Sequence, residues 1–108
     1  MDIKRIGDFK GGWFVGNFEP SAFQTEIFEV CYKIHTKGEK WDVHYHKLAT
    51  EINYLIEGEM IIQGQKLISG DIFIIYPYEV ANPEFLIDCK LIIIKTPSNT
   101  NDKYIIEK

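Results

Sequence analysis

Short apolar runs rich in Ile, Val, Phe and Tyr recur along the chain about every ten residues, separated by Gly, Pro, Asn and Asp. Runs of this length and spacing are typical of an all-β sandwich or barrel. The predicted strands are Trp13–Phe18, Ile27–Thr36, Trp41–His46, Glu51–Glu57, Met60–Gln63, Asp71–Tyr76 and Cys89–Lys95. Helix signals are nearly absent. Only Asn17–Gln24, with Ser21 as its cap, is predicted to form a helical turn.

The pattern indicates one domain spanning residues 1–108. The chain contains no internal repeat, no low-complexity tract and no charge block, and its 108 residues leave room for a single hydrophobic core. The N-terminal run Trp13–Phe18 and the C-terminal triplet Tyr104–Ile106 are expected to pack on the barrel or on a second subunit. Because a barrel of this size leaves apolar strand surface uncovered, we expect a homodimer.

The composition and charge of the chain argue against some classes of function. The chain carries 12 Lys and Arg against 16 Asp and Glu, a formal net charge of -4, so it is a poor candidate for binding nucleic acid or a membrane surface. No apolar run approaches the length of a bilayer-spanning helix, and the segment Met1–Ile6 lacks the apolar core of a signal peptide. These features predict a cytoplasmic protein. Cys31 and Cys89 are then expected to stay reduced and to pack in the core.

The most informative side chains lie in the middle of the chain. Side chains alternate along a strand, so His44 and His46 are predicted to share a face, with Tyr45 on the other. Glu51 follows a break and can bring a carboxylate to the same point from a neighbouring strand. Two neutral imidazoles and one carboxylate suit Fe, Zn, Mn, Ni or Co better than Ca or Mg. The alternative is a pair of barrel-lining histidines satisfied by hydrogen bonds, and the nearby carboxylate favours the metal.

The same residues resemble the first sequence motif of the cupin family, G(X)5HXH(X)4E(X)6G. Its fixed positions are all matched, by Gly38, His44, His46, Glu51 and Gly58. The resemblance to a single-domain, RmlC-like cupin implies a double-stranded β-helix, which is a jelly-roll barrel. For such proteins it also implies a dimer and a divalent transition metal inside the barrel mouth.

The second cupin motif, G(X)5PXG(X)2H(X)3N, is only half present. Gly70 and the apolar run after it fit its opening, but the family's proline and glycine fall on Tyr76 and Tyr78. The family's fourth ligand, a histidine, falls on Ala81, or on Asn82 if one residue is inserted. The departure implies a 2-His-1-carboxylate site with open positions, or else a weakened metal site.

Outside this set the sequence offers weaker candidates near the predicted mouth. Glu79 and Glu84 are the carboxylates that could carry protons. Four side chains are candidates for substrate contact, namely Tyr54, Tyr76, Tyr78 and Asn82. Tyrosines on a sheet are, however, more often core or interface residues.

Four further positions are interpreted from strand alternation and residue type. Lys33 and Lys40 are candidate contacts for an anionic ligand, although lysines are common on any surface. His35 is predicted to be solvated or lightly packed, without a functional role. Trp41 is predicted to pack on the face opposite His44.

Two functions of different classes fit these features. The first is a small metalloenzyme, by resemblance a dioxygenase or an isomerase, in which the metal acts as a Lewis acid or binds oxygen. The second is a module that binds a small sugar or carboxylate without turnover, at a weakened or empty metal site. The chain has no G-x-S-x-G elbow and no Cys/His arrangement that would indicate nucleophilic catalysis instead.

Overall fold

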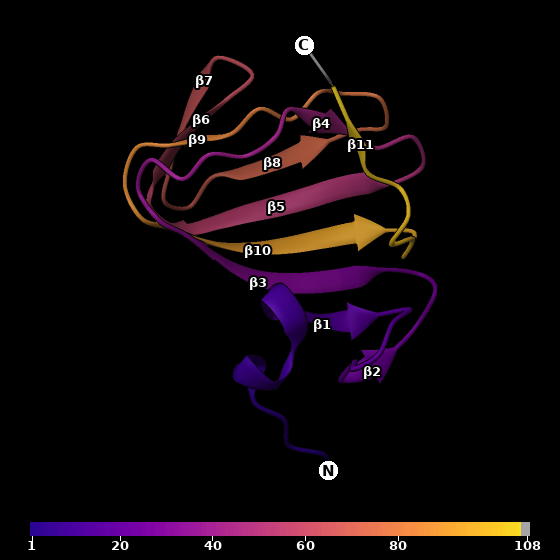
Figure 1. Ribbon diagram of the computed structural model, residues 1–108. Coiled ribbons are helices and arrows are strands. Elements are labelled where there is room, and N and C mark those ends of the chain that lie inside the picture. Colours follow the sequence, from indigo (N-terminus) through magenta and orange to yellow (C-terminus); the bar gives the residue numbers. More distant parts are fainter. Residues whose placement is uncertain (107–108) are drawn as a thin grey trace.

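The computed structural model describes residues 1–106, which form short strands in three sheets (Figure 1). The largest sheet has the strand order β2-β1-β3-β10-β5-β8. Its members are β1 (Trp13–Gly16), β2 (Phe23–Gln24), β3 (Glu29–His35), β5 (Thr50–Glu57), β8 (Ile72–Ile75) and β10 (Cys89–Thr96). The two smaller sheets contain β4 (His44–Tyr45) with β11 (Tyr104–Ile105), and β6 (Glu59–Ile62) with β7 (Gln65–Ile68) and β9 (Glu84–Phe85). Two short 3-10 turns, η1 (Ile6–Asp8) and η2 (Lys10–Gly12), precede β1.

Strands β3, β10 and β5 form the antiparallel centre of the large sheet, and the two smaller sheets lie at the end of the molecule away from β1 and β2 (Figure 1). Lys95 on β10 lies opposite Glu29 on β3 and opposite Glu51 on β5. Residues that face each other across antiparallel strands put their side chains on the same side of the sheet. The register therefore sets three charged side chains in one row across the inner face.

The hydrophobic core lies between the large sheet and the β7-β6-β9 sheet. It is formed by Leu55, Met60, Ile62, Ile75, Ala81, Phe85, Cys89 and Leu91. Both cysteines are buried free thiols, in agreement with the sequence, and burial raises the pKa of Cys31 to about 11. Each thiol therefore remains protonated at neutral pH and packs as a small apolar side chain.

Two strands approach each other so closely at Gly58, the last residue of the first motif, that only glycine fits there. Its φ of 131° lies in a region that L side chains rarely adopt. A Cβ at this position would lie 2.6 Å from Cys89 Sγ and 2.8 Å from Cys89 Cα. Glycine therefore allows the β5–β6 turn to pack directly on the start of β10.

All seven predicted strands exist, most of them with narrower bounds. The largest change is in the predicted strand Trp41–His46, of which only His44–Tyr45 is a strand. Four short strands were missed, namely β2, β7, β9 and β11. Three of these have only two residues, and the fourth has the sequence Gln-Lys-Leu-Ile, so no alternating apolar pattern marks them.

The predicted helical turn at Asn17–Gln24 was wrong. Ser21 does not cap a helix there: its hydroxyl accepts from Gly16 N at 3.2 Å and donates to Phe23 O at 2.9 Å. These two bonds hold a bend that returns the chain so that β2 pairs with β1 in parallel. A serine side chain that bonds the nearby backbone in this way competes with helix formation.

The C-terminal tail packs on the barrel, one of the two places that the sequence allowed. Tyr104 pairs with Tyr45, and Ile106 N donates to Val43 O at 2.9 Å. The tail thereby pairs with the strand that carries His44, the first motif histidine. No helix in residues 1–106 is long and apolar enough to cross a membrane.

Candidate metal and ligand site

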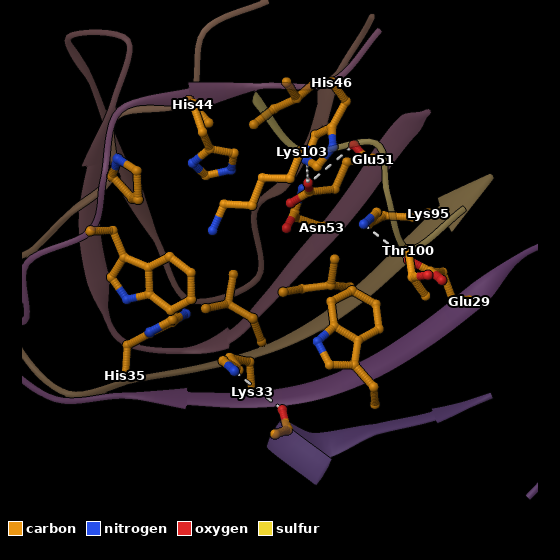
Figure 2. A pocket seen from close by; sticks show the side chains of 18 of the residues that line it. Glu29, Lys33, His35, His44, His46, Glu51, Asn53, Lys95, Thr100 and Lys103 are labelled. Carbon is orange, nitrogen blue, oxygen red and sulfur yellow. Dashed lines mark hydrogen bonds and ion pairs between the residues drawn. The ribbon is translucent and has the colours of Figure 1, made fainter. Parts of the chain in front are cut away.

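A cavity of about 520 Å³ lies between the inner face of the large sheet and the strands that cover it. Strand β5 contributes Glu51 and the buried Asn53 to its wall, and apolar side chains of β6, β9 and β10 line its deeper part. The polar wall includes Lys33, His35, His44, His46, Glu51, Asn53 and Lys95, and the apolar wall includes Met60, Ile62, Phe85 and Leu91. Figure 2 shows the polar side chains gathered around this space.

His44 and His46 both line the cavity and are 9% and 5% exposed. In each ring Nδ1 is bonded to a backbone carbonyl, that of Asp42 at 3.0 Å for His44 and that of Asp102 for His46. A ring that donates from Nδ1 carries its lone pair on Nε2. The pKa of His44 is lowered, chiefly by burial, which favours the neutral form that ligates metals.

Glu51 brings a carboxylate to the same end of the cavity. Its Oε2 lies 3.5 Å from His46 Nε2, and its side chain is only 15% exposed. Burial alone would raise the pKa of Glu51. The hydrogen bond and charge of His46, together with Lys95 in the next strand, outweigh burial and hold this pKa below its usual value. Glu51 is therefore ionised at neutral pH.

The position of the family's fourth ligand is occupied by Ala81. Ala81 pairs with His44 through two backbone hydrogen bonds, of 3.1 and 2.7 Å, and lines the cavity. Asn82 is exposed, and its Oδ1 accepts from Gln63 N. Of the two alternatives left by the sequence, the structure therefore selects Ala81, which offers no donor atom. Tyr78, at the motif's glycine position, has a φ of 69°, which is the left-handed conformation that glycine adopts freely.

The donor set fits a transition-metal ion by its chemistry: two imidazoles with Nδ1 anchored and one ionised carboxylate. The His44 and His46 ring centroids are 5.5 Å apart. As placed in residues 1–106, no three His, Cys, Asp or Glu side chains come close enough together to hold one ion. Closing these three donors around a metal therefore requires side-chain rearrangement.

Asp102 supports the site from the C-terminal tail, and no sequence signal pointed to it. The side chain is 2% exposed, and its carboxylate accepts from the backbone N–H groups of Lys47, Leu48 and Ala49 at 2.9–3.0 Å. These bonds hold the pKa of Asp102 below its usual value, although burial opposes them. Because its own carbonyl accepts from His46 Nδ1, Asp102 fixes both the turn after the histidines and the orientation of one ring.

The predictions for His35 and Trp41 were wrong. His35 is 6% exposed and stacks on Phe85 with centroids 4.1 Å apart, while its Nδ1 lies 2.6 Å from Glu39 Oε2. It shares a strand face with Cys31 and Lys33, as alternation predicts, but that face is buried and not solvated. Trp41 also lines the cavity and donates its indole N–H to Glu39. For Trp41 the alternation argument failed because residues 41–43 precede the strand, so their side chains do not follow its period. Glu39 links the two rings and was missed by the sequence reasoning.

Most of the other sequence candidates do not line the cavity. Six of them lie on the outside of the strands or in the loops around them, namely Glu79, Glu84, Tyr54, Tyr76, Tyr78 and Asn82. The carboxylate of Glu79 accepts from Tyr76 N at 3.0 Å and from Gln63 Nε2 at 3.1 Å, so it ties a surface turn together. Of the two lysines, Lys33 lines the cavity, whereas Lys40 is exposed outside it.

Comparison with known proteins identifies the fold. The chain matches no protein-family model, and no curated protein is similar to it in sequence. An uncharacterized protein with a double-stranded β-helix domain from Klebsiella pneumoniae has a TM-score of 0.69 at 22% identity, with 78% of this chain and 74% of that protein covered. An RmlC-like cupin from Shewanella frigidimarina has a TM-score of 0.63 at 22% identity, with 71% and 72% covered.

A third structure, the DMSP lyase DddQ from Ruegeria pomeroyi, has a TM-score of 0.67 at 15% identity. The match covers 86% of this chain but 49% of that protein, so the chain spans about half its length. These likenesses place the chain among all-β proteins with a double-stranded β-helix. More specifically, it has the cupin fold, a double-stranded β-helix, as the first motif predicts.

Proposed function

We propose that this protein is a small-molecule-binding cupin whose cavity holds a divalent transition metal on His44, His46 and Glu51. The proposal rests on one observation: in both rings Nδ1 is hydrogen-bonded to a backbone carbonyl. With each Nδ1 bonded to a backbone carbonyl, the Nε2 atoms are the ring nitrogens left to bind a metal, which would replace the contact between His46 Nε2 and the Glu51 carboxylate. Anchoring of this kind orients metal-binding histidines in proteins.

A bound metal would supply Lewis acidity at the polar end of the cavity. The chain's own residues would bind and orient the ligand: Asn53 offers an amide beside Glu51, and the apolar wall excludes water from the deeper part. One fold relative is a DMSP lyase, so the fold supports chemistry on a small molecule in that protein. At 15% identity that activity does not transfer, and the ligand of this chain has to be argued from its own cavity.

The proposal is tested by titrating the chelator-treated protein with Co²⁺ and Zn²⁺, using calorimetry and the visible absorption of bound Co²⁺. We expect one ion per chain. The substitutions H44A and E51Q should each weaken binding about 100-fold, because each removes one of three ligands. E57Q makes the same chemical change on the same strand, at an exposed carboxylate outside the cavity, and should leave the affinity unchanged. Binding that is absent, or equally weak in E57Q, would contradict the proposal.

A second candidate function is binding of a small ligand without metal. Two observations favour it: Ala81 replaces the fourth ligand, and His46 and Glu51 already contact each other. In that case Glu51 and the histidines would act as hydrogen-bonding groups for the ligand. The two candidates separate cleanly, since metal-free protein that binds its ligand with undiminished affinity in the presence of a chelator supports the second.

A further inference from the structure

The cavity gathers positive charge in a chain that is acidic overall. Its wall includes four lysines, Lys10, Lys33, Lys95 and Lys103, and three glutamates, Glu19, Glu29 and Glu51. The whole chain has a formal net charge of -4, whereas lysines outnumber glutamates in the cavity wall. Cations concentrated in a cavity of low dielectric attract an anionic ligand more strongly than the same charges would on an open surface.

The lysines of the cavity differ in whether a carboxylate neutralises them. Lys95 Nζ lies 2.9 Å from Glu29 Oε1, and Glu29 also accepts from the Ser98 hydroxyl at 2.8 Å. This buried pair is internally satisfied. Within residues 1–106, the other three lysines, Lys10, Lys33 and Lys103, form no ion pair; the Lys33 ammonium donates to the carbonyl of Gly11 at 3.2 Å.

Two of these three unneutralised ammonium groups, those of Lys33 and Lys103, lie near one aromatic ring. Lys33 Nζ lies 5.6 Å and Lys103 Nζ 4.9 Å from the centroid of Trp41. Lys33 comes from β3 and Lys103 from the C-terminal tail, and Figure 2 shows Lys103 beside the two motif histidines and Lys33 on the strand that also carries His35. Both ammonium groups therefore lie around the same part of the cavity wall, where like charges repel each other, and a bound anion would relieve the repulsion.

From this convergence we propose that the cavity binds a small organic carboxylate, with its anionic group between Lys33 and Lys103. Its apolar part would lie against Trp41 and the deeper apolar wall, which includes Phe85 and Leu91. A bare inorganic anion would leave that wall unused, so the apolar end favours an acid with a hydrocarbon body. This inference rests on the proposed small-molecule site and names its ligand class, but the lysine contacts do not require the metal.

The test is calorimetric titration of the full chain, in chelator at low salt, with two matched pairs of probes. These are 3-phenylpropionate with 3-phenylpropionamide, and benzoate with benzamide. At least one acid should bind about tenfold more tightly than its neutral amide, because charge-assisted hydrogen bonds are lost in the amide. K33Q and K103Q should each weaken acid binding about tenfold and the double substitution about 100-fold. K33R and K103R should retain binding, because they keep the charge.

K40Q is the matched control, since Lys40 is an exposed lysine outside the cavity, and it should bind the acids like the original chain. Amides that bind as tightly as acids, a double variant that binds normally, or failure of every acid to bind would overturn the proposal. The Co²⁺ titration of the same samples separates this inference from the proposed metal. Metal bound without carboxylate refutes only the ligand class, and carboxylate bound without metal refutes only the metal.

Discussion

The two faces of the six-stranded sheet are built from the same strands and differ in almost every property. On the inner face, Glu29, Lys95 and Glu51 form a charged row beside the cavity. The outer face carries an apolar row on every central strand, with Val30, Tyr32, Ile34, Ile52, Tyr54, Ile56, Ile72, Ile74, Ile92 and Ile94. Strand alternation thus places this charged row beside the core on the inner face, and an apolar outer face where an ordinary half-buried sheet is polar.

The difference between the two faces indicates that they contact different partners. In residues 1–106 no fully buried side-chain nitrogen or oxygen lacks a hydrogen-bond partner, so the inner charges are stabilised within the chain. The outer side chains are not covered in the same way: Ile72 is 67% exposed, and Tyr54 and Ile74 are 43% and 42% exposed. Contiguous apolar patches of this kind mark protein–protein contacts in soluble proteins. The inner face suits a small polar ligand, whereas the outer face suits another apolar surface.

The largest expected effect comes from placing charge on the outer face. We expect the protein to dimerise through this face, and the double substitution I72K/I74K to weaken the dimer about 1,000-fold, because two ammonium groups would be buried without partners. Sedimentation velocity over a micromolar concentration series measures the change. I68K introduces the same charge at an exposed isoleucine of β7, outside the large sheet, and should leave the dimer intact. A chain that is monomeric throughout the series would remove the prediction.

The second prediction concerns the support of the inner face by Asp102. The substitution D102A should lower the free energy of unfolding by at least about 2 kcal/mol, because three backbone N–H groups lose a charged acceptor. For a domain of this size we expect the melting temperature to fall by about 8 °C. Metal affinity should also fall by about 10- to 100-fold, since the tail carbonyl that orients His46 is no longer held.

The control for this prediction is D42A, at an exposed aspartate in the segment before β4. It removes one negative charge close to the histidines but no hydrogen bond of the Asp102 turn. Both variants would be measured by thermal unfolding and by Co²⁺ titration. Equal losses in the two variants would show that the effect depends on local charge rather than on the bonds that Asp102 accepts.

The sequence predicted the fold and the motif residues because both depend on local spacing. Alternating apolar runs indicated the strands, and the Gly, His and Glu positions of the first motif indicated the cupin fold. The residues it missed or misplaced line the cavity or hold its lining side chains, and they come from segments without a regular period. Trp41 and Glu39 lie in the loop before β4, and Lys103 and Asp102 lie in the polar tail. Spacing along the chain carries no information about such contacts, because they depend on where loops return in three dimensions.

The third prediction restores the ligand that the second motif lacks. Ala81 lines the cavity and pairs with His44, so A81H should place an imidazole beside the three existing donors and tighten Co²⁺ binding about tenfold. V80H is the matched control, because Val80 is an exposed neighbour that does not line the cavity. An affinity that rises equally in both variants would indicate binding elsewhere, and an unchanged affinity in A81H would show that this position does not face the metal.

The smallest expected effect is a pH dependence of stability that arises from Glu39 and His35, beside the cavity. Hydrogen bonds from Trp41 and His35 outweigh burial and hold the pKa of Glu39 at about 2, below its ordinary 4.5, while burial lowers the pKa of His35 below 6.5. For both groups the folded state binds its proton less readily than the unfolded chain does. The free energy of unfolding that these two groups contribute is therefore at its full value above about pH 6.5. It decreases below that pH as His35 becomes protonated in the unfolded chain, and it decreases further between pH 4.5 and 2 as Glu39 is protonated.

E39Q should lower the melting temperature at pH 7 by about 4–8 °C and flatten its decline toward pH 3. E84Q, at an exposed carboxylate of β9, should follow the original profile, and an E39Q profile as steep as the original would show that acid acts elsewhere in the molecule.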